Sequence, residues 1–211
     1  HDVRPVNHDL GPISTSVGVL GMPGMTAYFG LLEVLKPRAG DTLVVSAASG
    51  AVGAVVGQIG KINGCFVIGV AGSDEKCAYL IDELGFDGSI NYKTQDVSAE
   101  LVRLSPSGVD VYFDNVGGPI TDAVMENLAF KGRIAICGQI SQYNAATPQM
   151  GPRNFSVMTR MRGRIEGFLV YDFELQHEIA RVRISNWIKD GRIKYKEDIV
   201  DGFDNAPSAF A

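Results

Sequence analysis

The sequence predicts an α/β fold in which helices cover both faces of a doubly wound parallel sheet. Short runs of β-branched residues alternate with segments whose apolar residues recur at helical spacing, a pattern typical of parallel sheets. The clearest single indication is a strand–glycine turn–helix unit in residues 42–64. The 211 residues, 45% of them hydrophobic and 20% charged, are sufficient for a large buried core.

The unit begins with an apolar run, Leu43, Val44 and Val45, which is typical of a strand buried on both faces. Small residues follow, and the apolar period then changes to that of a helix, with Gly64 placed to end it. The apolar positions at helical spacing are Val52, Val55, Val56, Ile59 and Ile62.

The turn itself, residues 48–53, reads Ala-Ser-Gly-Ala-Val-Gly, which is the dinucleotide fingerprint G-x-G-x-x-G with alanine at the first glycine position. Gly50 lets a pyrophosphate approach the backbone, and Gly53 lets the helix pack closely on the strand. Backbone N–H groups and the positive end of a helix dipole meet at such a turn. We therefore expect a Rossmann-type site whose pyrophosphate is bound by Gly50, Ala51, Val52 and Gly53.

Two other interpretations of this stretch stay open. Residues 42–60 carry no charge, as a transmembrane helix would also require. Four glycines and two serines lower its hydropathy, and Asp41 and Lys61 bracket it closely, which counts against the membrane. The second alternative is a tight turn that binds no nucleotide.

Charge and cysteine usage restrict the partners. A net charge of −5 argues against nucleic acid or an anionic membrane surface as the main partner. Cys65, Cys77 and Cys137 are widely spaced and odd in number. We expect them to be reduced, mostly buried thiols of a cytoplasmic protein, and we expect no metal site from this chain alone.

Upstream of this unit, residues 1–10 have the composition of an unanchored polar end. A helix is predicted from Met25 to Leu35, ended by Pro37. Thr26, near its start, is placed to face a bound cofactor.

The second strand, Phe66–Ala71, ends in Gly72 and Ser73, where a chain that binds NAD usually has an acidic residue for the ribose 2′-hydroxyl. A small tip followed by Lys76 suits a 2′-phosphate, so we expect NADP(H). The two acidic residues between Ser73 and Lys76 leave NAD open, although they also favour the start of a helix over residues 74–84.

The third strand, Ser89–Tyr92, brings a tyrosine to the same edge of the sheet, where Tyr92 either stacks near the adenosine or packs as a half-buried side chain. A helix over residues 97–104 leads to the fourth strand, Val109–Asp114. This strand runs into Asn115 and two glycines, at the place where open α/β sheets bind their ligands.

After a helix from Ile120 to Phe130, the fifth strand is predicted at Arg133–Cys137. Its tip, residues 138–143, and the following loop to residue 154 are long enough to be functional. A sixth strand is expected at Ile165–Val170.

The last part of the chain is predicted to form a long amphipathic helix, Phe173–Lys189, with His177 at its surface. A short strand, Tyr195–Val200, follows it.

Five ordered segments, residues 47–53, 72–76, 91–93, 113–118 and 137–143, resemble the zinc-independent medium-chain reductases. This family includes prostaglandin reductases, plant 2-alkenal reductases and a bacterial curcumin reductase. The resemblance extends over essentially the full chain.

The resemblance implies an NADPH-dependent enzyme that reduces the carbon–carbon double bond of α,β-unsaturated ketones and aldehydes. By matching positions, Lys76 holds the 2′-phosphate and Tyr92 lines the adenosine side. Tyr143 is the candidate catalytic residue, because it matches a tyrosine near the reacting carbons; it either steadies the enolate oxygen or organises the nicotinamide ribose. The residues implied on the nicotinamide side are Asn115, Cys137, Gly138, Gln139, Ile140, Ser141, Tyr143, Phe168, Leu169 and Val170.

Family members also carry a GroES-like catalytic domain, which is absent from this chain. We therefore expect residues 1–22 to be a junction segment and residues 23–211 the NADP-binding domain, able to bind cofactor without turning over. The resemblance also implies a homodimer formed at the Ile165–Val170 edge. The alternatives are a quinone oxidoreductase, a zinc-dependent alcohol dehydrogenase whose ligands lie in the missing domain, and a non-catalytic NADP(H)-binding protein.

Overall fold

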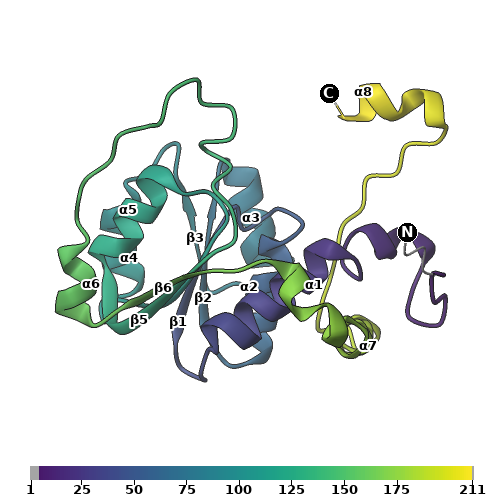
Figure 1. Ribbon diagram of the computed structural model, residues 1–211, viewed down its shortest axis with the longest axis horizontal. Helices are drawn as coiled ribbons and strands as arrows, with labels where there is room; N and C mark the ends of the chain where they lie inside the picture. The colour runs from purple at the N-terminus through teal and green to yellow at the C-terminus, as the bar shows by residue number, and fades with distance from the viewer. Residues whose placement is uncertain (1–4, 211) are drawn as a thin grey trace.

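The computed structural model describes residues 5–210 and contains a six-stranded parallel sheet in the order β3-β2-β1-β4-β5-β6 (Figure 1). The chain winds outward from β1 in one direction through β2 and β3, and in the other through β4, β5 and β6. The predicted doubly wound sheet is therefore confirmed. The first four residues of the expected junction segment lie outside the described residues. The strands are β1 (Thr42–Ser46), β2 (Phe66–Ala71), β3 (Gly88–Asn91), β4 (Val109–Asp114), β5 (Leu128–Ile136) and β6 (Arg164–Gly167).

Helices cover both faces of this sheet. One face is covered by α1, α2 and α3, with α7 packed on α1, and the other face is covered by α4, α5 and α6. The α-helices are α1 (Met22–Phe29), α2 (Gly53–Ile62), α3 (Asp74–Asp82), α4 (Val97–Leu104), α5 (Gly118–Glu126), α6 (Ser156–Met161), α7 (His177–Lys189) and α8 (Ala206–Phe210). Shorter turns are η1 (Ile13–Val17), η2 (Gly30–Leu35), η3 (Val170–Gln176) and η4 (Phe203–Asn205).

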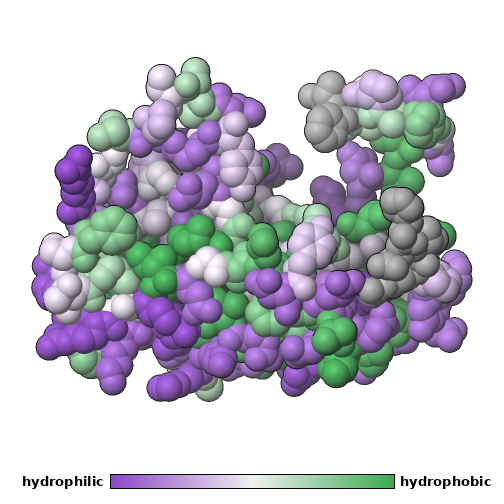
Figure 2. Space-filling model, viewed as in Figure 1, coloured by the Kyte–Doolittle hydropathy of each residue, from purple (hydrophilic) through white to green (hydrophobic). Residues whose placement is uncertain are grey.

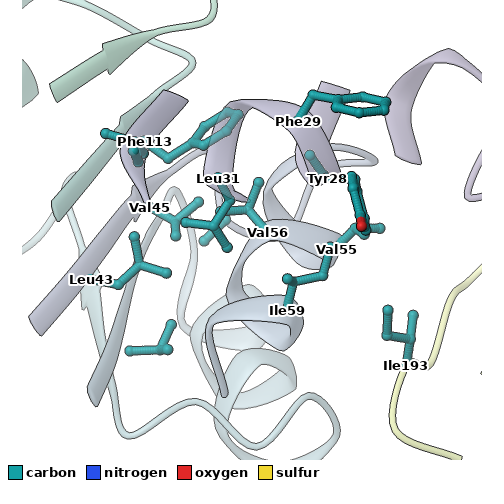
Figure 3. Packing of buried hydrophobic residues seen from close by; sticks show 14 of the residues in the cluster. Tyr28, Phe29, Leu31, Leu43, Val45, Val55, Val56, Ile59, Phe113 and Ile193 are labelled. Atoms are coloured by element: carbon teal, nitrogen blue, oxygen red, sulfur yellow. The ribbon is translucent and has the colours of Figure 1, made fainter. Parts of the chain in front are cut away.

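Alternation along the strands divides the core into two halves. Leu43 and Val45 of β1 belong to one cluster of buried residues, and Val44 between them belongs to the other. Successive side chains of a strand point to opposite faces, so a strand covered on both sides is apolar throughout. Figure 3 shows the first cluster, in which strand residues lie beside Val56 and Ile59 of α2.

Several predicted boundaries are wrong. The helix predicted to reach Phe130 ends at Glu126, because Leu128 already pairs with Val109 in the sheet. The sixth strand ends at Gly167, and residues 170–176 form η3. β6 nevertheless lies at one edge of the sheet, as predicted, and β3 lies at the other. Pairing of two copies at the β6 edge stays a prediction.

The strand predicted at Tyr195–Val200 is absent, because none of these residues pairs with a strand. The segment instead leaves the domain as an extended arm that leads to α8 (Figure 1). Exposed apolar side chains lie along it, visible at the upper right of Figure 2; Phe203 is 92% exposed.

A buried amide on α2 holds the start of this arm. Gln58 Nε2 donates to the carbonyl of Lys194 at 2.9 Å, and Gln58 Oε1 accepts from the N–H of Lys194 at 2.7 Å. One side chain thus pairs with both backbone groups of Lys194, as a neighbouring strand would. The helix that follows the glycine turn is therefore tied to the last segment of the chain.

Replacing Gln58 with methionine, which keeps the length of the side chain, should lower the free energy of unfolding by about 1–3 kcal/mol, because both backbone groups of Lys194 lose their partners. Urea denaturation measures this. Lys194→Met is the matched control, since it leaves the backbone bonds in place and should change stability by less than about 0.5 kcal/mol. Equal losses in the two variants would contradict the role of Gln58.

Candidate cofactor site

The turn between β1 and α2 leaves backbone N–H groups without partners. Ala47 has a left-handed conformation, φ 48°, and its carbonyl accepts from the N–H of Gly50 at 3.0 Å. A Cβ on Gly53 would lie 2.4 Å from that carbonyl oxygen, so only glycine fits. Within the described chain, the N–H groups of Ala51, Val52 and Gly53 have no acceptor. They stand at the positive end of the ten-residue helix α2, where an anion such as a pyrophosphate can bind.

The tip of β2 offers a cation. Ser73 caps α3, because its Oγ accepts from the N–H of Lys76 at 3.2 Å. The side chain of Lys76 is exposed and pairs with no carboxylate of the described residues. Asp74 is bound elsewhere: its Oδ1 accepts from Nδ2 of the buried Asn91 at 2.6 Å.

A cavity of ≈ 470 Å³ lies between these elements at the carboxyl ends of the strands. It joins the glycine turn, the tips of β2 and β3, the start of α5 and the loop after β5. Six predicted site residues line it together: Gly50, Gly72, Lys76, Tyr92, Ile140 and Ser141. The other predicted residues do not line it: Thr26, Ala51, Val52, Gly53, Ser73, Asn115, Cys137, Gly138, Gln139, Tyr143, Phe168, Leu169 and Val170.

Tyr92 forms one wall of the cavity. Its side chain is 45% exposed, and a Cβ on Gly72 would lie 3.1 Å from its ring. The small residue at the tip of β2 therefore makes room for the aromatic ring at the end of β3. Ala51 instead lines a separate cavity of ≈ 150 Å³ beside the start of the C-terminal arm.

The buried carboxylate of Asp114 organises the end of β4. It is fully buried and accepts hydrogen bonds from five groups. The donors are Ser46 Oγ at 3.2 Å, Tyr112 Oη at 2.9 Å, Thr121 Oγ1 at 2.6 Å, and the N–H groups of Val116 and Gly117, both at 2.9 Å. Burial, and then this carboxylate, raise the pKa of Tyr112, so its hydroxyl stays protonated and donates.

Asn115 follows β4 at the point between β1 and β4 where the strand order of the sheet reverses. Its N–H donates to Ser46 Oγ and its Nδ2 donates to the Ser46 carbonyl, both at 2.8 Å. Within the described residues, the amide oxygen of Asn115 has no donor. It is therefore available to a hydroxyl group at the topological switch point.

The first residues of the loop after β5 are hydrogen-bonded to the backbone of Asp114. The N–H groups of Cys137 and Gly138 both donate to the carbonyl of Asp114, at 2.8 and 3.1 Å. The hydroxyl of Tyr143 accepts from the N–H of Gln139 at 3.2 Å, which leaves its own hydrogen free to donate. Burial, and then Asp114, raise the pKa of Cys137 to about 11, so this residue remains a neutral thiol at pH 7.

The segment Phe168–Val170 packs beside α1 and η2. Phe168 meets Phe113 edge to face, with ring centroids 6.0 Å apart. A Cβ on Gly30 would lie 2.4 Å from the Phe168 ring, so η2 needs glycine there. Thr26 lies one helical turn before Gly30 and is half-buried.

The sequence reasoning missed Asp114 and Lys93 as functional residues. Lys93 lines the same cavity as Lys76. Its position directly after Tyr92, at the carboxyl end of a strand, is the signal that would have identified it. An aspartate that directly follows the apolar run 111–113 at the end of a strand is the corresponding signal for Asp114.

Asp114→Asn should lower the free energy of unfolding by about 2–4 kcal/mol, because an amide NH₂ would then face groups that donate to a charge. Tyr112→Phe removes one of these donors and should cost about 1–2 kcal/mol. Urea denaturation of both variants measures the difference. If Asp114→Asn costs no more than Tyr112→Phe, the carboxylate does not organise this turn.

The described residues include no group of three histidine, cysteine or carboxylate side chains placed to hold a metal ion. No helix among residues 5–210 has the length and apolar character needed to cross a bilayer. All three cysteines are free thiols, but only Cys65 is buried, whereas Cys77 and Cys137 are half-buried, so the prediction that they are mostly buried is wrong.

Comparison with known proteins places the chain in a family. A family model described as zinc-binding dehydrogenase matches residues 51–184. The 2-alkenal reductase (NADP(+)-dependent) of Nicotiana tabacum is 49% identical over 199 residues, which are 94% of this chain and 58% of that protein. The NADPH-dependent curcumin reductase of Escherichia coli (strain K12) is 44% identical over 215 residues, 99% of this chain and 61% of that protein.

A solved structure agrees with these matches. CurA from Vibrio vulnificus in complex with NADPH is 46% identical, with a TM-score of 0.87, over 93% of this chain and 60% of that chain. The chain thus spans about three fifths of the length of these relatives. With more than half of its residues matched by the family model, the chain belongs to the zinc-binding dehydrogenase family.

Proposed function

We propose that this chain is the NADP(H)-binding domain of a zinc-independent oxidoreductase that reduces the carbon–carbon double bond of α,β-unsaturated ketones and aldehydes. The observation that carries the proposal is the cavity at the carboxyl ends of the strands, which joins the glycine turn to Lys76 and Tyr92. The named activities of the similar reductases support the substrate class.

The adenosine half of the cofactor fits the β2 and β3 side. Pyrophosphate oxygens suit the unpaired N–H groups of the glycine turn, and Gly53 supplies space that a Cβ would fill. Lys76 and Lys93 both line the cavity and can hold a 2′-phosphate. Asp74 is held by Asn91, so its carboxylate is not free for a ribose hydroxyl.

The nicotinamide half fits the β4–β6 side. The amide oxygen of Asn115, which has no donor among residues 5–210, can accept from a ribose hydroxyl. In the segment after β6, the Phe168 carbonyl and the Val170 N–H have no partner among the described residues. A carboxamide offers one acceptor and two donors, so it can pair with both groups.

When bound, the reduced cofactor would supply the hydride for the β-carbon of the enone, and the proton for the α-carbon would come from solvent water. The chain's own residues bind the cofactor, orient its nicotinamide ring and stabilise the negative charge that develops on the substrate. Tyr143, whose hydroxyl hydrogen is free, donates to the oxygen that becomes negative as the hydride arrives.

Titration of this chain with NADPH and NADH tests the cofactor assignment. NADPH should bind more tightly, and Lys76→Ala should weaken it by about tenfold to one hundredfold, because a charge-assisted contact is lost. NADH binding should hardly change. Lys61→Ala is the matched control, since Lys61 pairs with Asp87 and does not line the cavity. The proposal fails if NADPH and NADH bind equally well to the unaltered chain.

Tyr143→Phe in the full-length enzyme tests the catalytic assignment. Loss of one donor to a developing oxyanion should lower kcat by about 10²-fold or more, with NADPH binding unchanged. Stopped-flow measurement of NADPH oxidation with an enone separates the two quantities. Unchanged turnover of the variant would show that Tyr143 has no catalytic role. If the unaltered enzyme reduced quinones but no enone, the proposed substrate class would be wrong.

A further inference from the structure

His177 is buried, contrary to the sequence prediction that placed it at the surface. Its side chain lies at the junction of η3 and α7, and the residue is 8% exposed. The ring lies beside Phe29, with centroids 5.6 Å apart, and Phe29 in turn stacks on Phe173 at 4.8 Å. An imidazole in this aromatic setting needs a hydrogen-bond partner for its polar edge.

That partner is the backbone carbonyl of Val170, 3.1 Å from His177 Nε2. A carbonyl oxygen can only accept, so Nε2 carries the hydrogen and donates. The bond joins the first residue of α7 to the first residue of η3, seven positions earlier.

This bond completes the anchoring of the segment Phe168–Val170. Phe168 packs against the Phe113 ring. The Leu169 carbonyl accepts from the Asp172 N–H at 3.1 Å, and the Leu169 N–H donates to Asp172 Oδ2 at 3.2 Å.

As the first residue of the 3₁₀ helix η3, Val170 already has its carbonyl in a hydrogen-bonded turn, and the His177 bond is the side-chain contact that ties this turn to α7. The Val170 N–H lies on the same peptide plane as the Leu169 carbonyl, which accepts from the Asp172 N–H. This plane and the plane held by His177 meet at the Val170 Cα, so both bonds together fix the direction of the Val170 N–H.

We propose that His177 is a positioning residue for the nicotinamide half of the cofactor: its Nε2–H holds the Val170 carbonyl and, together with the Asp172 bond to Leu169, keeps the Val170 N–H directed at the carboxamide. The inference rests on the proposed function, because it requires NADP(H) in the site. His177 itself does not touch the cofactor. Its contribution is to hold the segment in its binding conformation before the ligand arrives.

Two ligands separate positioning from general stability. NADPH occupies both halves of the site, whereas adenosine 2′,5′-bisphosphate occupies only the adenosine half. His177→Phe, which keeps a ring beside Phe29 but has no donor, should weaken NADPH about fivefold to tenfold. Its affinity for the bisphosphate should stay within about twofold. Isothermal titration calorimetry on the 211-residue chain measures both.

Two amide variants sharpen the test. The amide nitrogen of glutamine reaches about as far as Nε2, and that of asparagine only as far as Nδ1. His177→Gln should therefore restore NADPH affinity to within about twofold, whereas His177→Asn should behave like His177→Phe. Ile184→Ala is the control, because Ile184 is fully buried on the same helix and its loss should lower stability without changing the ratio of the two affinities.

The outcomes are distinguishable. If the unaltered chain binds the bisphosphate but gains nothing from the nicotinamide half, or binds neither ligand, the proposed function fails and this inference with it. If the unaltered chain prefers NADPH but the His177 variants weaken both ligands equally, or weaken neither, only the inference is overturned. The same holds if His177→Gln and His177→Asn lose NADPH affinity equally.

Discussion

The buried carboxylate of Asp114 is the interaction on which the site depends. A charge that is taken fully out of water must be compensated by hydrogen bonds, and here five donors converge on it. These donors come from β1, from β4, from the following turn and from α5. The carboxyl ends of the two central strands are thereby fixed to one another, and the turn that faces the ligand is set before the ligand arrives.

Packing on one face of the sheet also fixes parts of the site before the ligand arrives. Gly30 allows Phe168 to lie against Phe113, so the core beneath α1 also fixes the segment that follows β6. Gly53 acts in the same way at the other end of the site, because a side chain there would collide with the Ala47 carbonyl. The two halves of the site thus depend on close approaches that only glycine permits.

Periodicity and local turn chemistry are sufficient to predict the parallel sheet, the glycine turn and most elements before residue 126. The failures arise where the partner is remote in sequence. Residues 195–200 have the composition of a strand, but the residue before them, Lys194, pairs with the Gln58 side chain and not with a strand of the sheet. His177 has the polarity of a surface residue, yet its ring is buried beside Phe29, 148 positions earlier, with the Val170 carbonyl as its hydrogen-bond partner. The buried carboxylate of Asp114 likewise accepts a hydrogen bond from Ser46, which lies 68 residues earlier.

The tip of β2 shows how such a remote partner changes the chemistry that a local pattern suggests. Asp74 stands near the place where an acidic residue would receive a ribose hydroxyl. The amide of Asn91, at the end of β3, occupies its Oδ1, and this bond also ties the neighbouring strand to the start of α3. The carboxylate is thereby held in a structural pair, while Lys76 and Lys93 remain to face the cavity. The balance of charge at the tip is therefore set by β3 as much as by the residues of the tip itself, and it favours a phosphate over a hydroxyl.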